Sequence, residues 1–160
     1  MIFLGFSRPR VDARRTRPAN HETTNLEVPS KSEDRLSVRV LIADDHELVR
    51  RGLRSLLASR PGWEICGEAK DGVEAIEMTK ELAPDLILLD ITMPRLNGLE
   101  AARVIRREAP QTLILMLSQH DTEEMSASAF EAGARGYVSK SDVAGTLFRS
   151  MEELLHAGKD

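Results

Sequence analysis

The sequence predicts an α/β fold of the doubly wound kind, in which a five-stranded parallel sheet is covered by helices on both faces. Two observations lead to this fold class. From residue 37 onward, five short apolar segments alternate with five segments whose apolar residues recur every three or four positions. In addition, the third and fourth strand segments, 85–89 and 112–117, are continuously apolar after their first residue, as expected for strands buried on both faces. Such alternation implies right-handed crossovers and therefore a parallel sheet.

The first half of this alternation begins with the strand-like run VRVLIA over residues 38–43. The segment 46–59 is expected to be a helix, because apolar residues at positions 48, 49, 53, 56 and 57 form a stripe. Arg60-Pro61-Gly62 then ends this helix. The remaining elements of the first half are a strand over 63–69 and a helix over 72–82.

The second half continues the same pattern. Its helices are followed by breakers, namely Pro110, Gly133 and Gly158. The last helix carries the clearest apolar stripe, from Val143 to Leu155. The expected elements are strands over 85–89, 112–117 and 136–138 and helices over 98–107, 122–132 and 142–157.

Composition is typical of one globular domain. Of the 160 residues, 41% are hydrophobic and 30% are charged, which suits a single packed core. A lone cysteine, Cys66, excludes an internal disulfide and a cysteine-based zinc site, and the four histidines do not have metal-ligand spacing. A reducing, cytoplasmic location is therefore expected.

Residues 1–36 are expected to form a disordered leader ahead of a domain over residues 37–160, because residues 18–35 are polar and contain Pro18 and Pro29. Five arginines between Arg8 and Arg17 leave open an organelle transit segment or a basic arm. The domain holds 15 basic and 21 acidic residues, so direct nucleic-acid binding is not expected of it. No apolar run approaches the ~20 residues that a membrane-spanning helix needs.

Polar side chains stand at the ends of four expected strands. These are Asp44, Asp45, Asp90, Ser118 and Lys140. In doubly wound sheets, ligands bind outside the carboxyl ends of the strands, so these side chains are expected to meet there. Singly, each has an ordinary explanation: Asp44 or Asp45 could cap the next helix, and Lys140 could be a solvated lysine.

Together, these residues indicate phosphoryl transfer. Clustered carboxylates repel one another unless a cation joins them, and Mg²⁺ accepts carboxylate oxygens while keeping several waters. A metal ion and a lysine can neutralise phosphoryl oxygens, and an aspartate can act as a nucleophile by forming an acyl phosphate. Asp90 is the best candidate nucleophile, because it is central and the turn after it leaves room for a phosphoryl group. No GxxxxGK[ST], no GxGxxG after the first strand and no GxSxG elbow is present.

With these residues in view, the sequence resembles the receiver domain of two-component response regulators over residues 38 to about 158. The motifs that carry the resemblance are Asp44-Asp45, the run DITMP from Asp90 to Pro94, Asn97-Gly98, Ser118, Tyr137 and Lys140. The segments LIADDHELVRRGLRSLL and LSQHDTEE are most similar to receivers that precede a LuxR-type (NarL/FixJ-like) helix-turn-helix. The resemblance implies the flavodoxin-like (βα)5 receiver fold, with strand order 2-1-3-4-5.

The resemblance also implies what each residue does. Asp90 would accept a phosphoryl group from the phosphohistidine of a sensor histidine kinase. Mg²⁺ would be held by Asp44, Asp45, Asp90 and the backbone carbonyl of Thr92. Lys140 would pair with Asp90 and then with the phosphoryl oxygens.

Three further residues are implied in switching or in setting the lifetime of the phosphate. Ser118 would bond the phosphate and Tyr137 would follow inward, which is a two-state switch. Thr92 and His120 would tune dephosphorylation. His120 could equally be a solvated loop histidine, and Tyr137 a core aromatic with an exposed hydroxyl. No activity beyond Mg²⁺-dependent self-phosphorylation and self-dephosphorylation is expected.

Two features depart from the family pattern. Many receivers have a proline after the lysine, joined by a cis bond, whereas Ser141 follows Lys140 here. A cis bond before a residue other than proline costs ~3–4 kcal/mol, so the loop either bears that strain or the bond is trans. The sequence also ends without a helix-turn-helix, as expected of a single-domain regulator, a truncated product or an isolated piece.

Other functions stay open at this point. The fold could serve as a protein-binding module that does not depend on phosphorylation, or the chain could be the receiver fragment of a DNA-binding transcriptional regulator. A downstream protein or a DNA-binding output domain is the expected partner beside the kinase. A homodimer through the last helices is implied only by the family.

Overall fold

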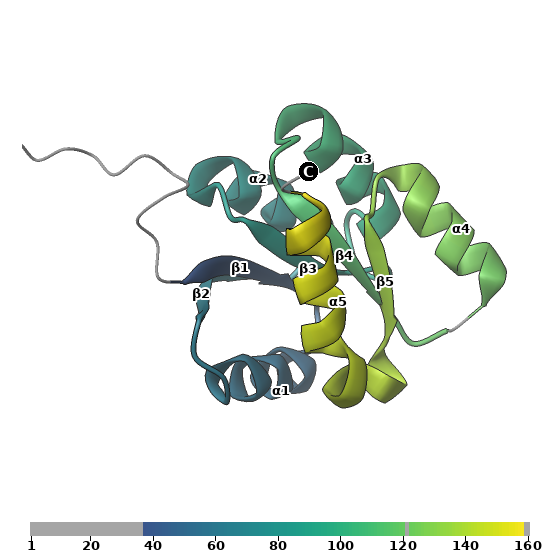
Figure 1. The fold of residues 1–160 in the computed structure, drawn as a ribbon. Helices are drawn as coiled ribbons and strands as arrows, with labels where there is room; N and C mark the ends of the chain where they lie inside the picture. Colours follow the sequence, from purple (N-terminus) through teal and green to yellow (C-terminus); the bar gives the residue numbers. More distant parts are fainter. Residues whose placement is uncertain (1–36, 121, 159–160) are drawn as a thin grey trace, which may run out of the picture.

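The computed structural model describes residues 37–120 and 122–158 (Figure 1). The leader expected over residues 1–36 lies outside the described residues, as does Asp121. None of the helices in the described part combines the length and hydropathy that a membrane crossing requires.

Five parallel strands form a sheet in the order β2-β1-β3-β4-β5. The expected fold class and strand order are therefore confirmed. The order of the strands reverses between β1 and β3, so the loops after these two strands flank one crevice at the carboxyl edge of the sheet. The strands are β1 (Val38–Ala43), β2 (Trp63–Ala69), β3 (Leu86–Asp90), β4 (Leu113–Ser118) and β5 (Gly136–Ser139).

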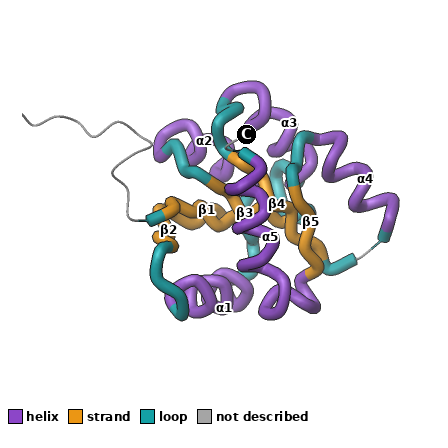
Figure 2. Tube along the Cα trace, viewed as in Figure 1, coloured by secondary structure: helices purple, strands orange, loops and turns teal. Residues whose placement is uncertain are grey.

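Helices cover both faces of this sheet (Figures 1 and 2). Helices α1 and α5 pack on one face, and α2, α3 and α4 pack on the other. Asp71, Asn97 and Thr122 cap α2, α3 and α4, each accepting a backbone N–H from three residues further on. The helices are α1 (Glu47–Ala58), α2 (Gly72–Leu82), α3 (Gly98–Glu108), α4 (Glu123–Ala132) and α5 (Val143–Ala157).

The central strand β3 is apolar because both of its faces are covered. Leu86 and Leu88 pack against the α1 and α5 side, while Ile87 and Leu89 pack against the α2, α3 and α4 side. All four side chains are fully buried. Each contributes roughly 1.5–3 kcal/mol of hydrophobic stabilisation. The burial of this apolar run thus fixes the position of Asp90, the next residue of the strand.

Some element boundaries differ from expectation at the edge that carries the polar residues. β3 extends to Asp90 and β4 to Ser118, so these two residues end the strands instead of following them. The reason is that Asp90 still pairs in register with Leu117. The last helix begins at Val143, after a 3-10 turn over Lys140–Asp142.

The buried face of α1 differs from the expected stripe. Leu48 belongs to that stripe, but 77% of it is exposed, so this part of the prediction is wrong. The helix instead buries Arg50, Leu53 and Leu57, which are spaced three and four residues apart. An arginine can turn inward where its guanidinium finds hydrogen-bond partners, and hydrophobicity alone does not reveal this.

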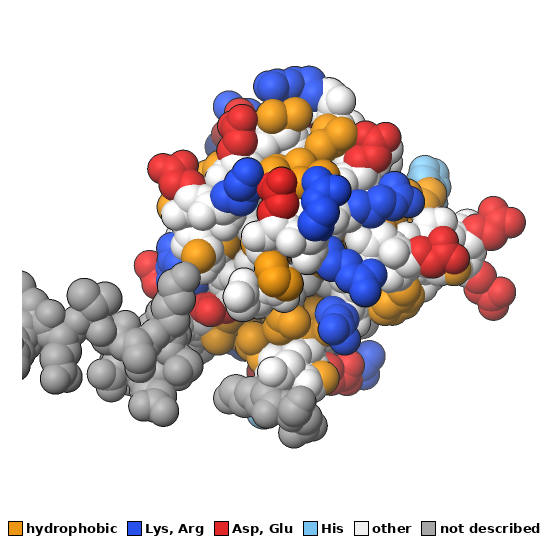
Figure 3. Space-filling model, turned by 90° about the horizontal axis from the view of Figure 1, so that it is seen from above, with side chains coloured by type: hydrophobic (Ala, Val, Ile, Leu, Met, Phe, Trp, Pro, Cys, Tyr) orange, Lys and Arg blue, Asp and Glu red, His pale blue; other side chains and the backbone are white. Residues whose placement is uncertain are grey.

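Charged side chains cover the face of the domain seen in Figure 3. Acidic and basic groups are interspersed there, with apolar side chains between them. The excess of acidic residues counted for residues 37–160 is therefore not gathered on this face.

Candidate functional site

Asp90 ends the most deeply buried strand of the sheet, and its side chain is only 4% exposed. Its Oδ1 atom lies 3.0 Å from Nζ of Lys140. Its Oδ2 atom is buried and has no hydrogen-bond partner among the described residues. This oxygen is therefore free to accept a bond from a ligand. Such a bond would be favourable, because a buried oxygen without a partner costs free energy.

These surroundings raise the pKa of the Asp90 carboxyl to about 6. Burial is the largest cause, and the neighbouring carboxylate of Asp44 acts in the same direction. The ammonium of Lys140 lowers the pKa but does not offset the other two causes. Asp90 is therefore mostly ionised at pH 7, although its charged form is disfavoured.

Asp44 follows β1 and is completely buried. Its N–H donates to the carbonyl of Ala69 at 3.0 Å, and its Oδ1 accepts the N–H of His46 at 2.9 Å. Its Oδ2 lies 2.6 Å from Nζ of Lys140. The N-cap of α1 is His46, without a side-chain capping bond, so the helix-capping explanation of Asp44 and Asp45 is wrong.

Lys140 follows β5 in the short 3-10 turn, and its Nζ bridges the carboxylates of Asp44 and Asp90. Burial alone would lower the pKa of Lys140, but the two carboxylates outweigh it and raise the pKa. Since its side chain is 10% exposed, the explanation as a solvated lysine is wrong. The described residues contain no cis peptide bond, so the Lys140–Ser141 bond is trans.

Metal-ligating atoms gather at the same edge. One such atom each from Asp44, Asp45, His46 and Asp90 lies within 4.8 Å of the others. The three carboxylates were expected there from the sequence, and His46 was not. Its Nδ1 lies 3.1 Å from Oδ1 of Asp45 and 3.2 Å from Oδ1 of Asp44. Thr92, whose carbonyl was also expected to bind the metal, is two residues after Asp90 and is exposed in the loop that follows β3.

Two glycines hold the loop between Asp90 and α3 close to the site. The N–H of Gly98 donates to the carbonyl of Ile91 at 2.7 Å, and a Cβ on Gly98 would lie 2.0 Å from the Asp90 carbonyl oxygen. Gly72 approaches the carbonyl of Leu96 in the same manner, where a Cβ would lie 2.2 Å away. The absence of side chains at both positions lets the loop close beside Asp90.

A second polar group lies at the end of β4. The hydroxyl of Ser118 donates to the carbonyl of His120 and accepts the N–H of the same residue, both at 3.0 Å. The hydroxyl of Tyr137 donates to that carbonyl as well. Among the described residues, no hydrogen bond or ion pair joins these three residues to Asp90 or Lys140. The expected site residues therefore form two separate groups.

Residues 40–151 match the family model of the response regulator receiver domain. The chain belongs to this family. The receiver-domain fold and function class expected from the sequence are thereby confirmed, and the relatives include LuxR-family regulators.

Two solved structures and one curated relative illustrate the similarity. The transcriptional regulatory protein DegU of Brevibacillus brevis is 36% identical over 76% of this chain and 51% of its own length. A LuxR-family response regulator from Aurantimonas sp. SI85-9A1 is 38% identical with a TM-score of 0.72, covering 76% of this chain and 86% of the other. The CheX–CheY–BeF3–Mg²⁺ complex of Borrelia burgdorferi is 25% identical with a TM-score of 0.70, covering 74% and 89%.

The receiver domain spans about half the length of several curated relatives that it matches. The similarity therefore concerns this domain. The activity and the partners of the whole relatives do not follow from it.

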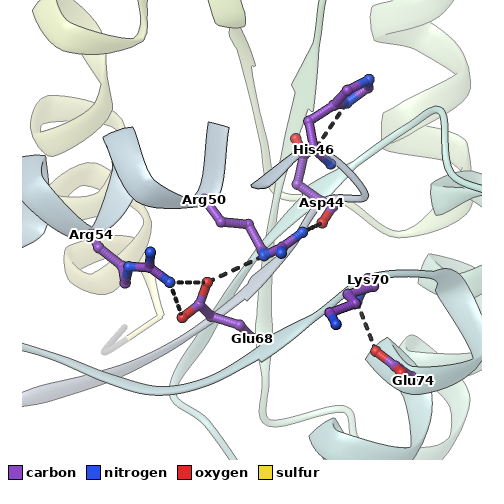
Figure 4. Close-up of polar contacts among 7 residues, drawn as sticks. All are labelled: Asp44, His46, Arg50, Arg54, Glu68, Lys70 and Glu74. Carbon is purple, nitrogen blue, oxygen red and sulfur yellow. Dashed lines mark hydrogen bonds and ion pairs between the residues drawn. The ribbon is translucent and has the colours of Figure 1, made fainter. Parts of the chain in front are cut away.

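The sequence did not reveal a network of polar side chains that lies beside Asp44 (Figure 4). The buried Arg50 donates to the backbone carbonyl of Asp44 and contacts Glu68, which also binds Arg54. The spacing of Arg50 with Leu53 and Leu57 could have indicated that Arg50 faces the sheet.

Proposed function

We propose that this receiver domain accepts a phosphoryl group on Asp90 and changes conformation in response. The observation that carries the proposal is the position of Asp90: a buried carboxylate at the end of β3, beside the Lys140 ammonium, with one oxygen unpaired. This role of Asp90 was a prediction from the sequence. The placement of Asp90, Asp44 and Lys140 within contact distance supports it.

The proposed donor is the phosphohistidine of a sensor kinase. An ionised oxygen of Asp90 attacks the phosphorus, and the phosphorus–nitrogen bond breaks. The bonding electron pair stays on the imidazole nitrogen, which takes up a proton, and Asp90 becomes an acyl phosphate. Lys140 already contacts Asp90 Oδ1, so its ammonium is within reach of the added oxygens. Lys140 would thus stabilise charge that develops there.

The residues present fit a divalent cation. Asp44, Asp45 and Asp90 supply hard oxygen ligands, and the unpaired buried Oδ2 of Asp90 gains from a cationic partner. We assign Mg²⁺ to these carboxylates and to the backbone carbonyl of Thr92. When bound, Mg²⁺ supplies positive charge that offsets the repulsion between carboxylates and phosphoryl oxygens.

The conformational change is assigned to the group at the end of β4. The hydroxyl of Ser118 now bonds the backbone of His120, so it must leave these bonds to reach a phosphoryl group on Asp90. The hydroxyl of Tyr137 donates to the same His120 carbonyl, so its hydrogen bond would change when Ser118 leaves. Thr92 and His120 are proposed to tune dephosphorylation, because both lie in loops at this edge.

Partners belong to the same proposal. They are a sensor histidine kinase and a downstream protein or a DNA-binding output domain, in keeping with relatives named transcriptional regulators. A homodimer and a cytoplasmic location remain predictions from the sequence. No catalytic activity is proposed beyond self-phosphorylation and self-dephosphorylation.

Intact-mass measurement tests the phosphoacceptor role. The full chain is incubated with Mg²⁺ and a small phosphodonor, beside the variants Asp90→Asn and Glu77→Gln. Glu77 is an exposed carboxylate of α2 and serves as the matched control. One added phosphoryl group in the parent and in Glu77→Gln, with none in Asp90→Asn, is expected. Equal phosphorylation of Asp90→Asn would contradict the proposal, and no gain in the folded parent would favour a module that works without phosphorylation.

A further inference from the structure

Arg50 is an unusual residue for its position. It lies on the buried face of α1 and is 6% exposed, on the same stripe as Leu53 and Leu57. Burying a guanidinium is unfavourable unless its donors are satisfied. A helical side chain leans toward the N-terminus of its helix, so Arg50 extends back toward the end of β1.

The partners of Arg50 are well defined (Figure 4). Its Nη1 atom donates to the backbone carbonyl of Asp44 at 2.7 Å, and its Nε lies 3.2 Å from Oε1 of Glu68. The Nη1 of Arg54 contacts both carboxylate oxygens of Glu68, at 2.7 and 2.6 Å. Glu68 thus orients the guanidinium of Arg50, and Arg54 in turn orients Glu68.

The contact with Asp44 fixes a particular peptide group. The Asp44 carbonyl belongs to the peptide that joins Asp44 to Asp45, and its orientation determines where the Asp45 side chain projects. The N–H of Asp44 is held by Ala69 of β2, and Arg50 holds its carbonyl. The backbone N–H and the backbone carbonyl of Asp44 are therefore both fixed by hydrogen bonds, next to the carboxylates of Asp44 and Asp45.

We propose that Arg50 is a positioning residue for the divalent-cation site, acting through the Asp44–Asp45 peptide, with Glu68 and Arg54 as its supports. The inference rests on the proposed function, since it requires that Asp44 and Asp45 hold Mg²⁺. Arg50 would contact neither the metal nor the phosphoryl group in this role, because its partners are the Asp44 carbonyl and Glu68. Supporting residues of this kind affect metal affinity about 10–100-fold when they are removed.

Charge and position predict opposite outcomes for removal of Arg50. As a nearby positive charge, Arg50 repels Mg²⁺, so Arg50→Met would tighten Mg²⁺ binding if charge alone mattered. As a positioning residue, its loss frees the Asp44–Asp45 peptide and weakens binding. The sign of the change in Mg²⁺ affinity therefore separates the two roles.

The experiment is a calorimetric Mg²⁺ titration of the full chain and four variants. Arg50→Met removes both charge and hydrogen bonds, and Arg50→Lys keeps the charge without the forked geometry. Arg51→Met removes an exposed arginine from the same helix. Leu154→Ala, in a residue buried near the end of α5, controls for lost stability, because destabilisation alone leaves the affinity of the folded protein unchanged.

The expected result is Mg²⁺ binding about 10-fold weaker in Arg50→Met, with a smaller weakening in Arg50→Lys. Arg51→Met and Leu154→Ala should stay within about 2-fold of the parent, a margin well below that supporting-residue effect. Amide NMR signals of Asp45 and His46 should shift in the Arg50 variants, which reports the position of the peptide without metal. Unchanged or tighter binding in Arg50→Met, beside a parent that binds, would overturn the role of Arg50 alone. A folded parent that binds no Mg²⁺ would overturn both this inference and the proposed metal site.

Discussion

The carboxyl ends of β1 and β3 are held much more firmly than helix α4. Asp44 and Asp90 are buried, and Lys140 bridges them. By contrast, the residues that α4 buries are two alanines, Ala129 and Ala132. Local opening costs less free energy where little apolar surface is buried, so α4 is expected to open more readily than the strands.

This difference fits the proposed division of the receiver domain into a phosphoacceptor site and a switching group. Among the firmly held residues, Asp90 has a raised pKa and an unpaired carboxylate oxygen. A change in the charge of Asp90 would therefore alter its contact with Lys140. The group of Ser118, His120 and Tyr137 is joined by hydrogen bonds to one backbone carbonyl and one N–H. A local charge change can shift such a loosely held element between two arrangements.

Gly98→Ala should disrupt the firmly held half most strongly. The new Cβ would lie 2.0 Å from the Asp90 carbonyl oxygen, and a backbone atom cannot yield as a side chain can. We expect a loss of roughly 3 kcal/mol in the free energy of unfolding, at the upper end of overpacking effects. Urea-induced unfolding measures this loss.

Gly52→Ala is the matched control, because a Cβ on this exposed helical glycine meets nothing within 4 Å. It should raise the free energy of unfolding by roughly 0.5–1 kcal/mol through the lower backbone entropy of alanine. An equal response of the two variants would show that the loop beside Asp90 is not held as described.

The raised pKa of Asp90 should make the metal-free domain less stable as pH rises from about 4 to about 6. The folded state holds the proton up to about pH 6, whereas the unfolded chain releases it near 3.8. Stability due to the protonated carboxyl is therefore complete below the unfolded value and lost as pH rises through the folded one. The shift corresponds to roughly 2–3 kcal/mol.

Asp90→Asn isolates this contribution, because the amide stays neutral at every pH. With a chelator present, Asp90→Asn should be more stable than the parent by roughly 2–3 kcal/mol at pH 7 and about equal to it at pH 4. Urea unfolding over that pH range provides the measurement. A pH-independent difference between the two proteins would mean that burial of Asp90 does not shift its titration.

The sequence predicted the fold and most of the site because both depend on regular patterns. Apolar runs gave the strands, and parallel strand ends brought Asp44, Asp90 and Lys140 together. It failed where a side chain acts against its usual preference. Leu48 is exposed and Arg50 is buried, and the burial of Arg50 depends on its contacts with the Asp44 carbonyl and with Glu68 of β2, which hydropathy does not reveal.

The hydrogen bonds of Ser118 and Tyr137 to His120 were likewise not readable from spacing. Spacing places residues at one edge of a sheet, but it does not tell which side chains bond one another. The hydrogen bonds to His120 depend on the local path of the chain after β4.

Tyr137→Phe should have the smallest effect of these changes and tests the loosely held half. The ring keeps its packing against the apolar cluster on the α2, α3 and α4 side, and only the bond from the hydroxyl to the His120 carbonyl is lost. We expect the free energy of unfolding to fall by less than about 1 kcal/mol, as for one hydrogen bond near water. Amide hydrogen exchange in α4 should become faster, while phosphoryl gain on Asp90 by intact mass stays unchanged. If Tyr137→Phe instead abolished phosphoryl gain, the two halves would not be separable, because the hydroxyl of Tyr137 would then belong to the acceptor site itself.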